Sequence, residues 1–534
     1  MARYVFVTGG VLSSLGKGIT ASSIGAIFKA QGYSVMIKKF DPYLNYNPGL
    51  MSPLQHGEVF VTEDGCEGDL DLGHYERFIN ENTNKTCDQT SGFIYYNVIE
   101  KERKGGFLGG TVQVIPHVTD EIKHSILEAD SEYDIVIVEI GGTVGDIEGL
   151  PFLEAIRQLR FDVGDERVAY VHVTPVFYMK AAGELKTKPA QHSVQKLREI
   201  GISPDMLICR SELPLSDEIR RKLALFCNVK KEAVMSAVDA APLYQVVMNM
   251  YQEGAAKELL AKFQMENRPA DLSRWEKLVH TIKNPKQAIT IAIVGKYVDV
   301  RDAYISLSEA MLHAGSVHHT KVEIKWIAAE NLEMKEPAEL LEGVHGILIP
   351  GGFGERGMQG KINATNYARN NDIPYLGVGS LGMQCAIIEY ARSVLKIDDA
   401  NCVEVDPKTK EPIITYIDGA GKPSNRAGEM RLGAHTETLA ADSLLARIYG
   451  KLEVTERHRH RLEFNDHYRQ RLIDAGMSIA AVDKYSGMVE AVELASHRWF
   501  IGCQFIPEYK SRPLAPHPIF VSFIAAALEY NSNS

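Results

Sequence analysis

A glycine-rich segment near the N-terminus has the residue types that bind phosphate. It spans residues 8–20 (TGGVLSSLGKGIT), after an apolar run and before a helix-like segment. In a P-loop, backbone N–H groups at a helix N-terminus hold phosphates, and a lysine reaches the outer ones. Five residues separate Gly10 from Gly16 where the standard motif has four. The segment therefore predicts a variant P-loop around Lys17, with a purely structural turn as the alternative.

Two carboxylates are candidates for binding the metal ion that accompanies ATP phosphates. Asp71 lies in the segment 69–78 (DLDLGHYERF), and Glu139 follows the apolar run 135–138 (IVIV). Ligands of open parallel sheets bind at the carboxyl ends of the strands. Carboxylate oxygens suit Mg²⁺. Either residue alone could be a surface charge, but beside a P-loop the pair favours a magnesium site.

Three lysines form a second candidate anion site. Lys186 and Lys188 lie in the segment 183–193 (GELKTKPAQHS), and Lys222 follows further along the chain. Together they could neutralise a second triphosphate. An isolated Lys-x-Lys is more often solvated.

The elements that must position these residues alternate between apolar runs and helix-like segments. Examples of the runs are 4–7, 35–37, 135–138 and 169–173. Such alternation indicates α/β architecture with mainly parallel sheets flanked by helices. Polar residues over 266–286 predict a linker, and a second series begins near residue 288. We expect one domain over 1–265 and another over 287–534.

Bulk properties exclude several functional classes. A formal net charge of -11 argues against nonspecific nucleic-acid binding. The chain has no apolar stretch long enough for a membrane span and starts without a signal-peptide core, so we expect a cytoplasmic protein. Its seven cysteines lack CxxC spacing, which predicts reduced thiols.

Five segments of the N-terminal half resemble the CTP synthase family. They are residues 13–20, 55–60, 69–78, 139–148 and 183–193. The resemblance implies an ATP-dependent amidoligase domain of the P-loop-like Rossmann type, fused to a class I glutamine amidotransferase domain. It also implies a homotetramer in pyrimidine biosynthesis.

The resemblance assigns a role to individual residues. Those that match the ATP site are Ser14, Leu15, Gly16, Lys17, Gly18, Ile19 and Asp71, with Val238, Asp239 and Ala240 at the adenine. Those that match the UTP or CTP site are Ser13, Asp146, Ile147, Glu148, Lys186, Lys188, Gln191 and Lys222. Lys39 matches the lysine near the transferred phosphate, and Asp71 and Glu139 match the Mg²⁺ ligands.

The family chemistry has a physical logic. A uracil carbonyl is a poor electrophile, so ATP phosphorylates O4, and magnesium and lysines stabilise charge during transfer. Ammonia then displaces phosphate at C4. The implied ligands are ATP, UTP and ammonia, with CTP as a feedback inhibitor.

The C-terminal half lacks the residues that would hydrolyse glutamine. Residues 374–384 (PYLGVGSLGMQ) resemble the LGICLGMQ elbow of class I glutamine amidotransferases. Gly379 and Ser380 stand in place of the cysteine, so the turn is one residue longer. Residues 503–508 (CQFIPE) resemble the segment QFHPE, with Ile506 where the base histidine belongs. A nucleophile needs a base nearby, and isoleucine cannot accept a proton, which also argues against Ser380 as a nucleophile.

Other parts of the glutamine pocket persist. Gly351 and Gly352 match the oxyanion strand, Glu404 and Arg461 match glutamine-binding positions, and Glu508 matches the third triad member. The change at Gln359, with the lid before Met430, makes GTP activation doubtful. The resemblance therefore implies a degenerate glutaminase and synthesis from free ammonia.

Several departures from the family pattern leave alternatives open. Leu50, Leu54, Gly68 and Phe177 differ from the residues we expect near the nucleotide pocket. The protein could be a specialised relative that aminates another nucleotide or uses another amine. It could also be a non-catalytic regulatory or scaffold protein, although Lys17, Asp71 and Glu139 weigh against that reading.

Overall fold

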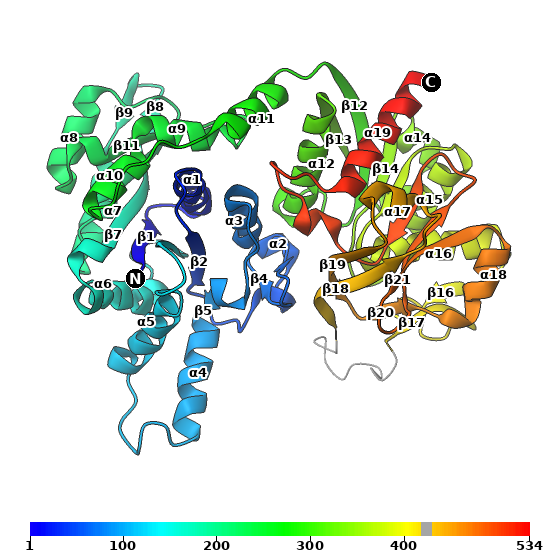
Figure 1. Cartoon of the computed structure of the whole chain (residues 1–534), viewed down its shortest axis with the longest axis horizontal. Helices are drawn as coiled ribbons and strands as arrows, with labels where there is room; N and C mark the ends of the chain where they lie inside the picture. The colour runs from blue at the N-terminus through cyan, green and yellow to red at the C-terminus, as the bar shows by residue number, and fades with distance from the viewer. Residues whose placement is uncertain (418–429, 534) are drawn as a thin grey trace. The chain divides into compact units, whose positions relative to one another are not determined.

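The computed structural model describes residues 1–417 and 430–533, and the chain divides into two compact units (Figure 1). Unit 1 comprises residues 1–48 and 71–280, and unit 2 comprises residues 49–70 and 281–534. The predicted domain over 1–265 therefore differs from unit 1, because residues 49–70 pack with the C-terminal part of the chain.

The predicted linker contains a helix. Helix α11, Ser273–Lys283, lies within 266–286, and the boundary between the units falls inside it. Trp275, Leu278 and Val279 are buried. Their three- and four-residue spacing gives this helix an apolar face, which the polar residues before and after it concealed in the sequence.

Unit 1 is built on a seven-stranded parallel sheet, as the alternation predicted. The strand order is β11-β10-β7-β1-β6-β2-β5. Every residue of β6 is buried, because helices cover both faces of a parallel sheet. The strands are β1 Arg3–Gly9, β2 Val35–Asp41, β5 Asp88–Thr90, β6 Ile135–Ile140, β7 Val168–Pro175, β10 Met206–Ser211 and β11 Val234–Val238. A separate hairpin pairs β8 Phe177–Met179 with β9 Glu184–Lys186.

The helices of unit 1 connect these strands. Helix α1 contacts α3 and α9, while α5 packs on α6 and α7 on α8. Their bounds are α1 Lys17–Ala30, α3 Asp71–Ile79, α4 Ser91–Arg103, α5 Thr119–Leu127, α6 Leu150–Val163, α7 Lys188–Glu199, α8 Asp217–Cys227, α9 Gln245–Glu253 and α10 Ala255–Lys262. Since α1 begins immediately after the glycine-rich segment, that segment lies at the carboxyl end of β1.

Unit 2 contains a nine-stranded mixed sheet. Its order is β13-β12-β14-β15-β23-β22-β21-β18-β19, parallel from β13 to β23 and antiparallel from β23 to β19. The strands are β12 Gln287–Gly295, β13 Thr320–Ala328, β14 Gly346–Ile349, β15 Tyr375–Gly377, β18 Arg431–Leu439, β19 Glu453–His460, β21 Met477–Asp483, β22 Val489–Leu494 and β23 Phe500–Cys503. A small sheet joins β16 Ala400–Cys402, β17 Glu411–Tyr416 and β20 Leu462–Phe464.

The larger sheet of unit 2 carries the remaining helices. They are α12 Ile305–Val317, α13 Asn331–Met334, α14 Pro337–Leu341, α15 Met358–Asn370, α16 Gly379–Ser393, α17 Leu444–Tyr449, α18 Arg469–Asp474 and α19 Pro518–Asn533. No helix in the described ranges is long and apolar enough to cross a membrane. All seven cysteines are free thiols.

Residues 49–70 are held in unit 2 by two arginines of β19. The segment contains helix α2, Pro53–His56, and the pair of strands β3 Phe60–Val61 and β4 Glu67–Gly68. Arg457 is fully buried and donates to Glu63 Oε1 at 3.0 Å and to the Val61 carbonyl at 3.1 Å. Arg459 donates to Glu67 Oε1 at 2.8 Å. These charged contacts explain why residues 49–70 pack in unit 2, although the residues before and after them in the sequence belong to unit 1.

Candidate functional site

The glycine-rich segment has the geometry of a phosphate-binding loop. Gly16 has φ of +92°, a conformation that favours glycine, and α1 starts at the next residue. A Cβ on Gly9 would lie 2.8 Å from Lys17 Cδ, so this glycine makes room for the lysine. Lys17 is buried and donates to the Gly142 carbonyl at 2.8 Å, and burial lowers its pKa. A phosphate would offer this buried cation a charged partner.

Lys39 contacts several carboxylates at the edge of the sheet where the parallel strands end. Lys39 pairs in register with Glu139, and Val7 of β1 pairs with Glu139 from the other side. The Lys39 ammonium donates to Asp71 and lies 3.2 Å from Glu139 Oε1. Although burial opposes ionisation of Asp71, Lys39 outweighs it and holds the pKa of Asp71 at about 2. Both predicted metal ligands are therefore placed together with the predicted phosphate lysine.

The two predicted metal ligands converge on one point. A Cβ added to Gly18 would lie 2.3 Å from Asp71 Oδ1 and 3.2 Å from Glu139 Oε2. The missing side chain thus leaves a space flanked by two carboxylate oxygens at the start of α1. Hard oxygen ligands beside a phosphate-binding loop fit Mg²⁺.

Asp41 is a member of this cluster to which no role was assigned from the sequence. It ends β2, is buried, and its Oδ1 lies 3.8 Å from the Lys39 ammonium. Burial and the nearby carboxylates, against Lys39, raise its pKa to about 7. Its position two residues after Lys39, in the segment KKFD, was the available signal.

The segment 183–193 is brought to the phosphate loop through Ser193. Ser193 Oγ lies 2.7 Å from His172 Nε2, and His172 Nδ1 lies 2.9 Å from Thr8 Oγ1. A Cβ on Gly10 would lie only 1.7 Å from Ser193 Oγ, so α7 approaches the loop closely. His172 joins the two segments, and no motif had indicated it.

The predicted UTP-site residues are mostly exposed around this junction. Lys186 forms an ion pair with Glu184. The positive charges of Lys186 and Lys222 both lower the pKa of Glu184, so both lysines lie near this carboxylate. Gln191 is buried and donates to Thr187 Oγ1 at 3.0 Å. Of the others, Ser13 and Asp146 lie in loops, Ile147 and Glu148 begin a short 3-10 helix, and Lys188 begins α7.

The predicted adenine residues connect to the loop through an arginine. Asp239 accepts a 2.7 Å hydrogen bond from Arg210 Nε. Arg210 in turn lies 3.0 Å from the point where a Cβ of Gly16 would sit. Val238 ends β11, and Ala240 follows it. Arg210 was missed by sequence reasoning.

In unit 2, a cavity of about 510 Å³ collects every predicted remnant of the glutamine pocket. These residues are Gly351, Gly352, Gly379, Ser380, Glu404, Arg461, Ile506 and Glu508. Leu50, Met51 and Glu58 of the segment 49–70 line the same cavity. Their contribution was not predicted, because it depends on the packing of that segment against unit 2.

The elbow places Gly379, not Ser380, where a nucleophile would face the cavity. Gly379 has φ of +64°, and its Cβ would lie 3.1 Å from Gly351 Cα and 3.8 Å from Ile506 Cγ1. This is the position from which a side chain could meet both the oxyanion strand and the base. Ser380 instead lies in the first turn of α16, where Gln384 donates to its hydroxyl.

Glu508 is left without the partner that a base would supply. It is buried, and its Oε2 has no hydrogen-bond partner in the part of the chain that the structure describes. Burial, with a contribution from Glu58, raises its pKa to about 8. In a triad, a histidine at the position of Ile506 would donate a hydrogen bond to this carboxylate.

The polar end of the cavity is intact. Glu404 forms an ion pair with Arg461 and accepts a 3.0 Å hydrogen bond from the Gly354 N–H. Lys296 donates to the carbonyls of Phe353 and Gly354, both at 2.7 Å. A ligand with a charged amino-acid group could thus still be recognised there.

The positions that depart from the family pattern are scattered. Leu50 lines the cavity of unit 2, Leu54 is exposed on α2, and Gly68 ends β4, all within residues 49–70. Phe177 lies on the β8–β9 hairpin of unit 1. The first three belong to unit 2, and their expected place near the nucleotide pocket remains a prediction. The lid before Met430 falls in 418–429, outside the described residues.

Comparisons with known proteins agree in both halves of the chain. Residues 3–265 match the family model "CTP synthase N-terminus", and residues 299–526 match "Glutamine amidotransferase class-I". A CTP synthase of Methanocaldococcus jannaschii is 53% identical, with 98% of each chain covered, and one of Herpetosiphon aurantiacus is 52% identical, with 99% of each covered. A solved glutaminase domain of Trypanosoma brucei CTPS with bound acivicin is 39% identical, with 45% of this chain and 94% of that chain covered and a TM-score of 0.43.

Proposed function

Because this chain belongs to the CTP synthase family, we propose that it is an ATP-dependent ligase that converts UTP to CTP with free ammonia as nitrogen donor. The clustering of Lys17, Lys39, Asp71 and Glu139 at one edge of the sheet supports the ligase activity. The apolar Ile506 beside the elbow glycine supports the choice of ammonia.

The ligase residues have distinct roles in this proposal. Lys17, at the N-terminus of α1, binds the outer phosphates of ATP, and Lys39 stabilises the charge on the phosphoryl group as it moves to O4 of UTP. Asp71 and Glu139 would hold Mg²⁺, which supplies positive charge to the phosphates when bound. Ammonia then attacks C4, and phosphate leaves with O4 while the nitrogen loses protons to solvent.

The second triphosphate occupies the region around α7. Lys186, Lys188 and Lys222 neutralise its phosphates, and Gln191 and Asp146–Glu148 border it. CTP competes there as a feedback inhibitor. An exposed hairpin carrying Phe177 adjoins this region, which keeps amination of another nucleotide as a second candidate.

The absence of a proton acceptor at residue 506 is the observation that carries the choice of ammonia. A thiol at the elbow would need a base within hydrogen-bond reach, and the residue facing Gly379 is an isoleucine. The cavity then serves as a structural remnant, and GTP has no glutaminase to activate. The assembly as a homotetramer and the cytoplasmic location belong to the same proposal.

The decisive experiment supplies purified protein with ATP, Mg²⁺ and UTP, and either ammonium or glutamine. We expect CTP with ammonium, none above background with glutamine, and no release of glutamate even with GTP present. Lys17→Ala should abolish CTP formation from ammonium, because no other charge in the loop replaces the lysine. Sustained glutamate release that Ser380→Ala removes would overturn the proposal for the nitrogen source.

A further inference from the structure

Three buried side chains of unit 2 present metal-binding atoms to one another. His458 and His460 lie two residues apart on β19 and so point to the same face, and Glu490 comes from β22. His458 Nδ1 lies 3.0 Å from His460 Nε2 and 3.8 Å from Glu490 Oε2. All three side chains are fully buried, and their three ligand atoms lie within 4.8 Å of one another.

The other ring nitrogen of each histidine already has an acceptor. His458 Nε2 lies 2.9 Å from Glu437 Oε1, and His460 Nδ1 lies 3.1 Å from the Leu462 carbonyl. Gln504 Nε2 also lies 3.2 Å from His460 Nδ1, but its shorter contact, 2.7 Å, is to the same carbonyl. A carbonyl cannot donate, so Nδ1 of His460 carries the proton. The inner nitrogen of His460, Nε2, is then left with its lone pair, and it lies 3.0 Å from His458 Nδ1.

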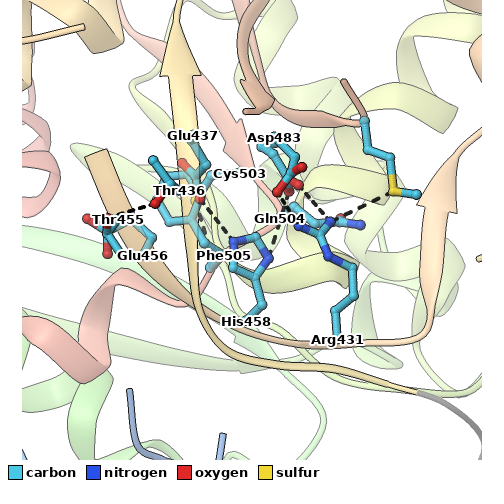
Figure 2. A network of polar contacts seen from close by, with 12 residues as sticks. Arg431, Thr436, Glu437, Thr455, Glu456, His458, Asp483, Cys503, Gln504 and Phe505 are labelled. Carbon is cyan, nitrogen blue, oxygen red and sulfur yellow. Dashed lines mark hydrogen bonds and ion pairs between the residues drawn. The ribbon is translucent and has the colours of Figure 1, made fainter. Parts of the chain in front are cut away.

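Glu490 has one oxygen in use and one that points to the histidines. Arg431 donates to Glu490 Oε1 at 2.6 Å. Glu490 Oε2 has no hydrogen-bond partner among residues 1–417 and 430–533. Figure 2 shows His458 between Glu437 on one side and the carboxylates around Arg431 on the other. A fully buried, unpartnered carboxylate oxygen therefore points toward two imidazoles.

The charges around this cluster favour a bound cation. Arg431 contacts three carboxylates, Glu463 at 3.0 Å, Asp483 at 3.1 Å and Glu490 at 2.6 Å. Glu437, against His458, adds a fourth carboxylate. Buried charge of one sign must be neutralised by protons or by counter-ions.

We propose that His458 Nδ1, His460 Nε2 and Glu490 Oε2 bind a divalent transition-metal ion, for which Zn²⁺ is the best match. Ligand atoms about 2.0–2.2 Å from a tetrahedral Zn²⁺ lie about 3.3–3.6 Å apart, and the two observed separations lie on either side of that range. Glu437 and the Leu462 carbonyl orient the histidines as outer partners of metal ligands do. Imidazole ligands distinguish this site from a Mg²⁺ site.

The role of this ion is structural. It joins β19 to β22, two strands that are not neighbours in the sheet, because β18 and β21 lie between them. β19 also carries Arg457 and Arg459, which hold residues 49–70. Zinc binding therefore fixes the strand that anchors that segment, and it is independent of the proposed ligase activity.

The test uses the full chain without a histidine tag. After treatment with chelator and incubation with Zn²⁺ or Co²⁺, desalted protein is measured by elemental analysis and by visible absorption of Co²⁺. We expect about one ion per chain, a Co²⁺ spectrum typical of nitrogen and oxygen ligands, and a higher melting temperature than that of the chelated protein. His460→Gln and Glu490→Gln should each lose the ion.

Two further variants keep the test decisive. Glu437→Gln leaves all three ligands in place and should weaken Zn²⁺ binding about 10–100-fold, even if the ligand variants fold poorly. His517→Gln is the matched control, since His517 is also buried in unit 2 and lies 3.1 Å from Glu456 Oε1 outside the cluster. Wild-type protein that retains no ion, or equal retention in wild type, His460→Gln and Glu437→Gln, would overturn the proposal.

Discussion

At the scale of single residues, the proposed loss of glutaminase activity rests on two positions that face each other. The nearest side-chain atom to a Cβ on Gly379 belongs to Ile506, so nucleophile and base positions are still in register. The extra residue of the turn is taken up by Ser380 at the start of α16. The elbow thus lacks the cysteine, but residues 379 and 506 still face each other.

Because residues 379 and 506 face each other, we can predict which substitutions restore glutamine hydrolysis. Gly379→Cys with Ile506→His should release glutamate from glutamine, whereas each single variant should not, because nucleophile and base act as a unit. A side chain at φ of +64° costs about 1–3 kcal/mol, so the double variant should also be less stable. Glutamate release and urea unfolding measure the two effects.

A variant with a shorter turn tests whether Gly379 is the nucleophile position. Deleting Ser380 from the double variant restores the shorter turn but shifts the residues that follow. If the deletion variant hydrolyses glutamine faster than the double variant, then the extra residue displaces the nucleophile, and the position assigned to Gly379 is wrong.

Glu508 predicts a pH dependence of stability. Its pKa in the folded protein, about 8, lies above its ordinary value of 4.5, so the folded state binds this proton more tightly than the unfolded state. The free energy of unfolding should therefore fall as pH rises from about 4.5 to 8, by about 1.4 kcal/mol per unit of pKa difference at most. Glu508→Gln should remove this component and flatten the profile by a few kcal/mol. Urea unfolding of both proteins from pH 5 to 9 measures it, and parallel profiles would contradict the prediction.

At the scale of elements, the ligase site is made by strands that end at one edge. The pairing of Lys39 with Glu139 across β2 and β6 sets their separation, and the start of α3 adds Asp71. Parallel strands bring residues far apart in sequence to the same edge. The cluster therefore depends on strand register more than on any local motif.

The position of the two carboxylates predicts that their substitution raises the Mg²⁺ concentration that the enzyme needs. Glu139→Gln and Asp71→Asn should each raise the Mg²⁺ concentration for half-maximal CTP formation at least about tenfold, which corresponds to about 1.4 kcal/mol. Melting temperatures should fall only modestly, because the amides keep the shape of the side chains and Lys39 keeps its other carboxylate partners, Asp41 among them. An unchanged Mg²⁺ requirement in both variants would show that the ion binds elsewhere.

At the scale of the whole molecule, the chain divides inside the predicted linker, and one earlier segment also changes unit. Residues 49–70 leave unit 1 between β2 and α3, pack in unit 2, and return. Arg457, which is fully buried, holds them through Glu63. Breaking a buried ion pair by removing one partner costs about 3–5 kcal/mol.

We therefore expect a fragment of residues 281–534 to be less stable than the same fragment fused through a flexible linker to residues 49–70. At about 2–4 °C per kcal/mol, the difference in melting temperature should be at least about 5 °C. Glu63→Gln in the fused protein should reproduce part of the loss. Equal melting temperatures of the two fragments would show that the segment adds nothing to unit 2.

The sequence by itself determined the features that depend on local order. The P-loop around Lys17, the alternation of strands and helices, the pair Gly379-Ser380 in place of the cysteine, and Ile506 in place of the histidine are all readable from contiguous residues. Local spacing specifies a turn, a helix start or a missing functional group without reference to the rest of the chain.

Only the tertiary structure decided which distant residues meet. It placed Asp41 beside Lys39, residues 49–70 in unit 2, and His458, His460 and Glu490 in one buried cluster. It also showed that Glu508 is buried with an unpartnered oxygen within the described residues. Strand register, and packing between segments hundreds of residues apart, set these contacts, and neither is encoded in any single stretch of sequence.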